Sequence, residues 1–309
     1  MGHGKLRKFA ENETFRCLVQ PEASAVLDKE PGSRALRLKD HPIKGRWGQE
    51  IFGNDHPIVL ELGCGRGEYT LALARRHPEV NYIGVDIKGA RLWKGAKEAT
   101  ECALPNVAFL RTRIEFIEAF FGPAEVAGIW LTFSDPQLRG SENARLSSPM
   151  FLERYRKFLV PDGIVHLKTD SRYLYEYTMS VCQVNHLQVL ASGTDIYREG
   201  IQVPESSLRD PSQSAVPFGQ RLWAPPSYKA EGGHGFGDLY ALPEEEVLQV
   251  QTFYEQMFLQ MGLPITYLAF RIGHEGPYAF PGEAFDHDYW LRAEGPRRSF
   301  SHQPSSTGE

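Results

Sequence analysis

The sequence has few cysteines, and they lie far apart. Its 309 residues contain four, Cys17, Cys64, Cys102 and Cys182, without a C-x-x-C pair or a histidine at a ligand spacing. A disulfide framework and a zinc site both require closer or paired spacings. We therefore expect reduced thiols, a cytoplasmic protein and no bound metal.

Long apolar runs are also missing. Every apolar stretch is interrupted by glycine or charge well before the roughly 20 residues that a membrane-spanning helix needs. The first eight residues, Met1 to Lys8, carry basic side chains but no apolar segment of the kind that follows in a secretory signal. With 41% hydrophobic residues, the composition is that of a globular protein with a sizeable core and no membrane partner.

An overall excess of positive charge, which would favour a nucleic-acid partner, is absent because the formal net charge is -5. The basic residues are nevertheless concentrated locally. Residues 1–52 hold ten Lys/Arg against seven Asp/Glu, and residues 88–113 hold six against two. Binding to phosphates depends on the local electrostatic potential, so these basic residues could bind RNA. They are equally explained as ordinary surface charge without a partner.

Apolar segments and helical patterns alternate from Ile58 onward. Strands are expected at residues 58–62, 82–86, 107–110, 129–133, 163–168 and 265–270, and helices at 68–77, 90–102 and 244–261. Such alternation predicts an α/β fold with a mostly parallel sheet and helices on both faces. We divide the chain into an irregular N-terminal extension (1–56), a main domain (57–272) with a Gly/Pro/Ser-rich insertion (199–242), and a C-terminal tail (273–309), partly disordered.

A glycine-rich turn follows the first predicted strand. Gly63, Gly65 and Gly67 are spaced G-x-G-x-G, which departs from the G-x-G-x-x-G of dinucleotide-binding turns. Asp86 ends the next strand, where a carboxylate can hold ribose hydroxyls. Glu61 precedes the turn; its charge would repel a pyrophosphate but suits the cationic amino-acid end of S-adenosylmethionine. The methyl donor is thus favoured over a dinucleotide or a turn without a ligand.

Further carboxylates follow later strands at the same expected edge of the sheet. Asp135 lies in Phe133-Ser134-Asp135-Pro136, and Asp170 ends Lys168-Thr169-Asp170. Thr252 and Glu255 belong to a later predicted helix. Each alone is also explained by a helix cap, a turn or a surface position. Together with the glycine turn they indicate a substrate site.

These motifs, in this order, resemble those of the bacterial tRNA (guanine-N7-)-methyltransferases. The resemblance extends over residues 45–177 and 252–272, and F-S-D-P, K-T-D and T-x-Y-E (Thr252-Phe253-Tyr254-Glu255) are its specific elements. It implies a Rossmann-like class I methyltransferase fold with a seven-stranded sheet. It also implies methyl transfer from S-adenosylmethionine to N7 of a guanosine in the variable loop of tRNA.

The resemblance implies roles for single residues. Glu61, Asp86 and the glycine turn would bind S-adenosylmethionine, and Asp135 would be catalytic, beside both the methyl group and the guanine. The residues implied to bind the substrate are Arg139, Asp170, Thr252 and Glu255. The basic residues of the extension that could contact the RNA backbone are Arg34, Arg37, Lys39, Lys44 and Arg46.

The sequence departs from the family pattern after Asp135. The usual D-P-W-P-K is Asp135-Pro136-Gln137-Leu138-Arg139, and the basic run that follows is diluted. The acidic residue expected after the third strand is replaced around Arg113-Ile114. Two alternatives therefore stay open: a methyltransferase of the same fold that acts on another RNA or a small molecule, and a non-catalytic tRNA-binding adaptor.

Overall fold

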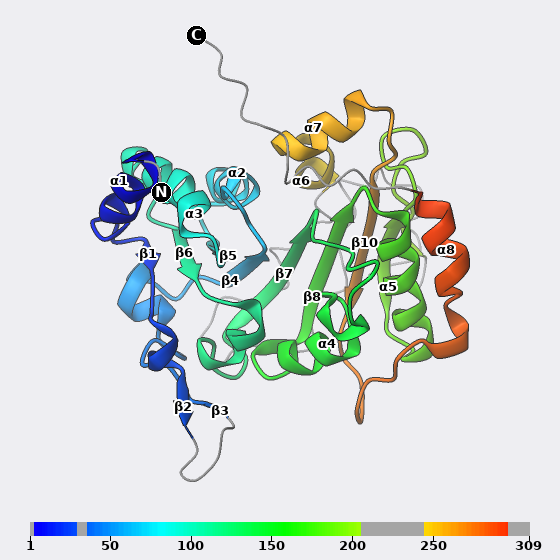
Figure 1. Ribbon diagram of the computed structural model, residues 1–309, viewed down its shortest axis with the longest axis horizontal. Coiled ribbons are helices and arrows are strands. Elements are labelled where there is room, and N and C mark those ends of the chain that lie inside the picture. Colours follow the sequence, from blue (N-terminus) through cyan, green and yellow to red (C-terminus); the bar gives the residue numbers. More distant parts are fainter. Residues whose placement is uncertain (1–2, 30–35, 205–243, 296–309) are drawn as a thin grey trace.

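The computed structural model describes residues 3–29, 36–204 and 244–295, and it is built around one twisted sheet (Figure 1). The strand order is β1-β6-β5-β4-β7-β8-β10-β9. All pairings are parallel except those of β10, which runs antiparallel to both neighbours. The strands are β1 (Leu18–Val19), β4 (Ile58–Leu62), β5 (Asn81–Asp86), β6 (Val107–Arg111), β7 (Val126–Thr132), β8 (Leu159–Thr169), β9 (Val189–Gly193) and β10 (Thr266–Arg271).

The predicted fold class is confirmed, although this sheet has one strand more than the seven expected. The additional strand is β1, two residues long, which joins the edge of β6. The sequence pattern also gave no indication of β9, because this strand is short and three of its side chains, Ala191, Ser192 and Gly193, are small.

Each face of the sheet carries its own hydrophobic cluster, because successive side chains of a strand point to opposite faces. Leu60, Leu62 and Leu131 face the side covered by α4 (Pro149–Tyr155) and α5 (Arg172–Val184). Val59 and Trp130 face the side covered by other helices. These are α2 (Glu68–Arg76), α3 (Gly89–Glu101), α6 (Glu244–Gln249) and α7 (Phe253–Gln260). Helices thus cover both faces, as predicted.

The chain order fixes where a ligand can bind. From β4 the chain builds outward through β5 and β6, then crosses back to place β7 on the other side of β4. Open α/β sheets bind ligands at the carboxyl ends of the strands at such a switch point. The glycine turn after β4 and the Asp135 segment after β7 both lie there.

The N-terminal extension is more regular than predicted. It contains α1 (His3–Asn12), which packs on α3, and a separate hairpin of β2 (Leu27–Lys29) and β3 (Leu36–Leu38). A π-helix over Gly48–Phe52 precedes β4, and the Trp47 indole before it donates to the Phe120 carbonyl at 2.8 Å. The segment is therefore a series of short regular elements rather than an irregular extension.

The C-terminal third also departs from the predicted pattern. The single helix expected over residues 244–261 is divided into α6 and α7. Thr252 is the N-cap residue of α7, so a second helix begins there. The predicted tail contains α8 (His287–Glu294), which lies along α5. Most of the predicted insertion and the end of the tail fall outside the described residues. Within the described part, no helix is both long and apolar enough to cross a membrane.

Candidate functional site

The glycine turn is shaped by backbone conformation and by one carboxylate. Gly63, Gly65 and Gly67 all have positive φ (82°, 58° and 73°), which favours glycine. A Cβ at Gly67 would also lie 2.5 Å from the Phe109 ring, so this glycine brings α2 close to the sheet. The Asp86 carboxylate accepts hydrogen bonds from the Gly65 amide at 3.0 Å and the Lys88 amide at 2.7 Å. Asp86 therefore holds the turn against the end of β5.

Glu61 is a buried carboxyl group at the base of the turn. One oxygen accepts from the Thr70 amide (2.9 Å) and hydroxyl (2.5 Å), and the other accepts from the Thr132 hydroxyl (2.5 Å). No Lys or Arg forms an ion pair with Glu61 within the described residues. Burial raises the pKa of Glu61 to about 7, and the neighbouring charge of Asp86 adds to the rise. A cationic ligand group at this position would supply the missing positive charge.

In the segment after β7, two residues with an unusual backbone conformation flank Asp135. Phe133 and Gln137 both have positive φ (50° and 52°), which is uncommon for residues other than glycine. The exposed Asp135 carboxylate accepts from the Gln137 amide at 2.9 Å. Strain of this kind persists where surrounding contacts enforce it, often at functional sites.

Arg145 supplies such contacts from a buried position. Its guanidinium donates to the carbonyls of Pro136 (3.2 Å) and Gln137 (3.4 Å) and to the Tyr173 hydroxyl (2.6 Å). It also lies over the rings of Tyr173 and Tyr177. Arg145 thereby ties the Asp135 segment to the start of α5.

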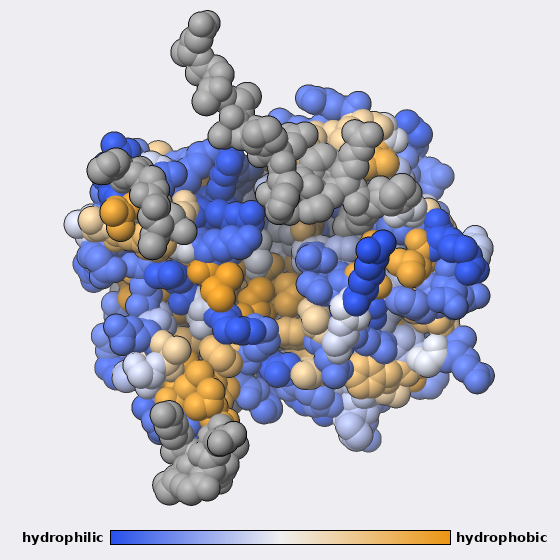
Figure 2. All heavy atoms as spheres, viewed as in Figure 1, coloured by the Kyte–Doolittle hydropathy of each residue, from blue (hydrophilic) through white to orange (hydrophobic). Residues whose placement is uncertain are grey.

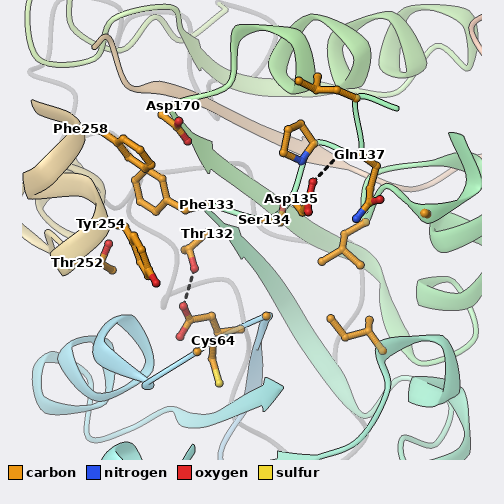
Figure 3. A pocket seen from close by; sticks show the side chains of 18 of the residues that line it. Cys64, Thr132, Phe133, Ser134, Asp135, Gln137, Asp170, Thr252, Tyr254 and Phe258 are labelled. Carbon is orange, nitrogen blue, oxygen red and sulfur yellow. Dashed lines mark hydrogen bonds between the residues drawn. The ribbon is translucent and has the colours of Figure 1, made fainter. Parts of the chain in front are cut away.

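Three of the five predicted site carboxylates, Glu61, Asp135 and Asp170, line one cavity of about 1120 Å³. Asp135, Asp170 and Thr252, carried by three separate elements, surround it in Figure 3, and the Tyr254 ring projects into it. Gly63, Gly65 and Arg139 also line it. Figure 2 shows hydrophobic residues in the middle of the face that is seen in this view, with hydrophilic residues around them. The volume exceeds the roughly 300–1,000 Å³ typical of small-ligand sites, which suits a donor and a base together.

Glu255 and Lys168 form an ion pair inside the protein. Their charged atoms lie 2.7 Å apart, and both side chains are fully buried. Lys168 also donates to the carbonyls of Val247 and Val250, and the Tyr197 hydroxyl donates to the same Glu255 oxygen at 2.7 Å. The pair fastens the junction between α6 and α7 to β8, and Glu255 is not among the residues lining the cavity.

The structure adds residues that the sequence pattern did not single out. The cavity is also lined by the basic side chains Arg66, Lys88 and Arg91 and by Leu291 and Arg292 of α8. Lys88 and Arg91 could have been suspected from the sequence, because residues 88–113 carry an excess of basic side chains. Gly67 and Asp86, which were predicted to bind the donor, are not among the residues that line the cavity.

Two other predictions can be compared with the structure. Three basic residues of the extension are engaged in local ion pairs, Lys39 with Asp28, Lys44 with Asp40 and Arg46 with Glu50, while Arg34 lies outside the described residues. Within the described residues, no group of three or more His, Cys, Asp or Glu side chains is arranged to hold a metal ion.

Comparison with known proteins gives consistent similarities. A family model described as "Putative methyltransferase" matches residues 55–210. The chain is 42% identical to a tRNA (guanine-N(7)-)-methyltransferase of Bacteroides thetaiotaomicron, over 97% of this chain and 98% of that protein. It is 40% identical to the protein of that name from Christiangramia forsetii, over 87% of this chain and 97% of that one. Among solved structures, the 16S rRNA methyltransferase KamB is 16% identical with a TM-score of 0.42, covering 77% of this chain and 96% of that one.

Proposed function

The chain belongs to the tRNA (guanine-N(7)-)-methyltransferase family, and from this premise we propose that it methylates N7 of a guanosine in the variable loop of tRNA. The observation that carries the proposal is the cavity itself. It joins the glycine turn and Glu61 with Asp135, Asp170 and Thr252 at the carboxyl edge of the sheet. The similarity to the Bacteroides thetaiotaomicron protein includes the residues that line this cavity, because it extends over 97% of this chain.

The residues present fit S-adenosylmethionine as the methyl donor. Glu61 is a buried carboxyl group without a cationic partner among the described residues, and the amino-acid end of the donor carries a cationic ammonium group. The glycine turn allows a ligand to approach the backbone, and Asp86 stands at the strand end suited to ribose hydroxyls. When bound, S-adenosylmethionine supplies an activated methyl group.

This chain's residues then act by orientation and by charge. Guanine N7 carries a lone pair in the plane of the ring, so a general base is unnecessary. Methylation leaves the guanine cationic, and a carboxylate at Asp135 or Asp170 stabilises the positive charge as it develops. Thr252 and Arg139 provide hydrogen-bonding groups for the base and its nucleotide, and positioning lowers the barrier further. Glu255 holds the Thr252 segment in place through Lys168.

The proposal includes a cellular location and a domain arrangement. We place the protein in the cytoplasm, which suits four free cysteines and a tRNA substrate. The N-terminal segment extends the sheet through β1 and belongs to the methyltransferase domain as one folded unit.

A methyl-transfer assay tests the proposed function. The protein is incubated with labelled S-adenosylmethionine and unmethylated tRNA transcripts, and the product is cleaved at 7-methylguanosine. We expect cleavage at a single variable-loop guanosine. Donor binding without tRNA methylation would instead favour another RNA or a small molecule as substrate, and no donor binding would favour an adaptor.

The pKa of Glu61 leads to a pH dependence of donor binding. The carboxyl must ionise to attract a cation, and with a pKa of about 7 its ionised fraction increases as pH rises. We expect the affinity for S-adenosylmethionine to increase roughly fivefold between about pH 6 and about pH 7, measured by calorimetry, below the range of about pH 7.7–8.0 in which an α-amino group loses its own charge. In Glu61→Gln the affinity should be lower and this increase should be absent. An equally steep profile in the variant would assign the titration to another group.

A further inference from the structure

The last described residues close one side of the cavity. Leu291, Arg292 and Gly295 line it, at the end of α8. Figure 1 shows α8 at the outer side of α5, running along it. The end of α8 therefore lies at the carboxyl edge of the sheet, although it is far in sequence from the family motifs.

Specific contacts fix α8 in this position. The Glu294 carboxylate accepts from the Tyr173 amide at 2.9 Å, and the His287 ring nitrogen Nδ1 lies 2.6 Å from the Tyr173 hydroxyl. Asp286 caps the start of the helix by accepting from the Tyr289 amide, and the buried Phe285 ring packs edge-on against Tyr173. Both ends of α8 are therefore attached to the first turn of α5.

The same tyrosine connects α8 with the Asp135 segment. Its hydroxyl receives a hydrogen bond from Arg145, which also donates to the carbonyls of Pro136 and Gln137. The position of α8 is thus set relative to Asp135 through two side chains. A group at the end of α8 has a defined place beside the substrate site.

Arg292 is the group that α8 brings to the cavity. It is exposed and forms no ion pair with the described residues. The other cations of the lining are likewise without an ion-pair partner in that part of the chain: Arg66, Lys88, Arg91 and Arg139. Cations left unpaired around a cavity attract a polyanion, and RNA phosphates are bound by arginine side chains of this kind.

We propose that α8 is part of the tRNA-binding surface and that Arg292 contacts a backbone phosphate beside the target guanosine. The inference rests on the proposed function, since it assumes tRNA in the cavity. Arg292 also compensates for the small number of basic residues after Arg139, because α8 supplies a cation from another part of the chain.

Substitution of Arg292 tests the inference. Binding of a tRNA transcript is measured over a range of salt concentrations for wild type, Arg292→Ala, Arg292→Lys and Arg292→Glu. We expect Arg292→Ala to weaken binding about five- to tenfold and to reduce the slope of log affinity against log salt by about one. Arg292→Glu should weaken binding further, and Arg292→Lys should stay near wild type.

Lys157→Ala is the control for the loss of one exposed positive charge away from the cavity. Lys157 pairs with Glu118 and lies next to the start of β8, at the end of that strand opposite to Asp170. This variant should retain the affinity and the salt slope. Melting temperatures should be unchanged in all variants, because the side chains of Arg292 and Lys157 are both exposed. An Arg292→Ala protein with wild-type affinity and slope would overturn the inference alone. A wild-type protein that binds no tRNA would overturn both the inference and the proposed function.

Discussion

Asp135→Ala should reduce kcat for tRNA methylation by at least about a hundredfold, since it removes charge stabilisation at the reacting guanine. The side chain is exposed and accepts a hydrogen bond from the Gln137 amide, a contact within its own loop, so the fold should survive. We expect Asp170→Ala to have a similar effect. The measurement is single-turnover methyl transfer at saturating tRNA and donor, accompanied by melting temperatures.

Two further variants make this result specific. Asp135→Asn retains the shape of the side chain but loses its charge, so a comparable loss would assign the effect to electrostatics. Glu101→Ala removes an exposed carboxylate of α3 that pairs with Lys97, and it should leave turnover unchanged. Wild-type turnover in Asp135→Ala would remove Asp135 from the catalytic site.

The second large effect should come from Lys168. Lys168→Met leaves the Glu255 carboxylate buried without its cation and removes the hydrogen bonds to Val247 and Val250. We expect the free energy of unfolding to fall by about 3–5 kcal/mol, measured by urea denaturation. The affinity for tRNA should also fall, because the junction that presents Thr252 and Tyr254 is released.

A double variant separates the ion pair from a direct role in substrate binding. Lys168→Met combined with Glu255→Met replaces the pair by apolar side chains of similar size, which is often neutral for stability. We expect stability and much of the tRNA affinity to return. If Glu255 instead contacted the guanine, the double variant would be stable and still unable to bind the substrate.

Much of the sheet could be predicted because its strands are short apolar runs that end in chemically distinctive residues. The strands β4, β5, β6, β7, β8 and β10 lie within a few residues of their predicted positions. Glu61, Asp135 and Asp170 were placed at one edge because parallel strands share their carboxyl ends. Local pattern and topology together sufficed for these residues.

The rest depended on contacts between distant residues. Lys168 and Glu255 are 87 positions apart, and nothing in either neighbourhood indicates that they form a buried pair. Gly273 to Gly282 resembles a tail by composition, yet the Asn185 side chain binds both backbone groups of Ala279. That contact directs the chain along α5 and makes α8 part of the cavity.

The two-residue strand β1 has a consequence for behaviour in solution. Leu18 and Val19 pair with Phe109 and Leu110, so β6 is no longer the outer strand. At the opposite edge, Ser192 of β9 forms an isolated bridge with Gln202. Open sheet edges recruit strands from other copies and promote aggregation, and short or partly covered edges prevent this. Since β1 is only two residues long, it replaces the five-residue edge of β6 by a much shorter one, and we expect a protein without β1 to associate more readily through β6.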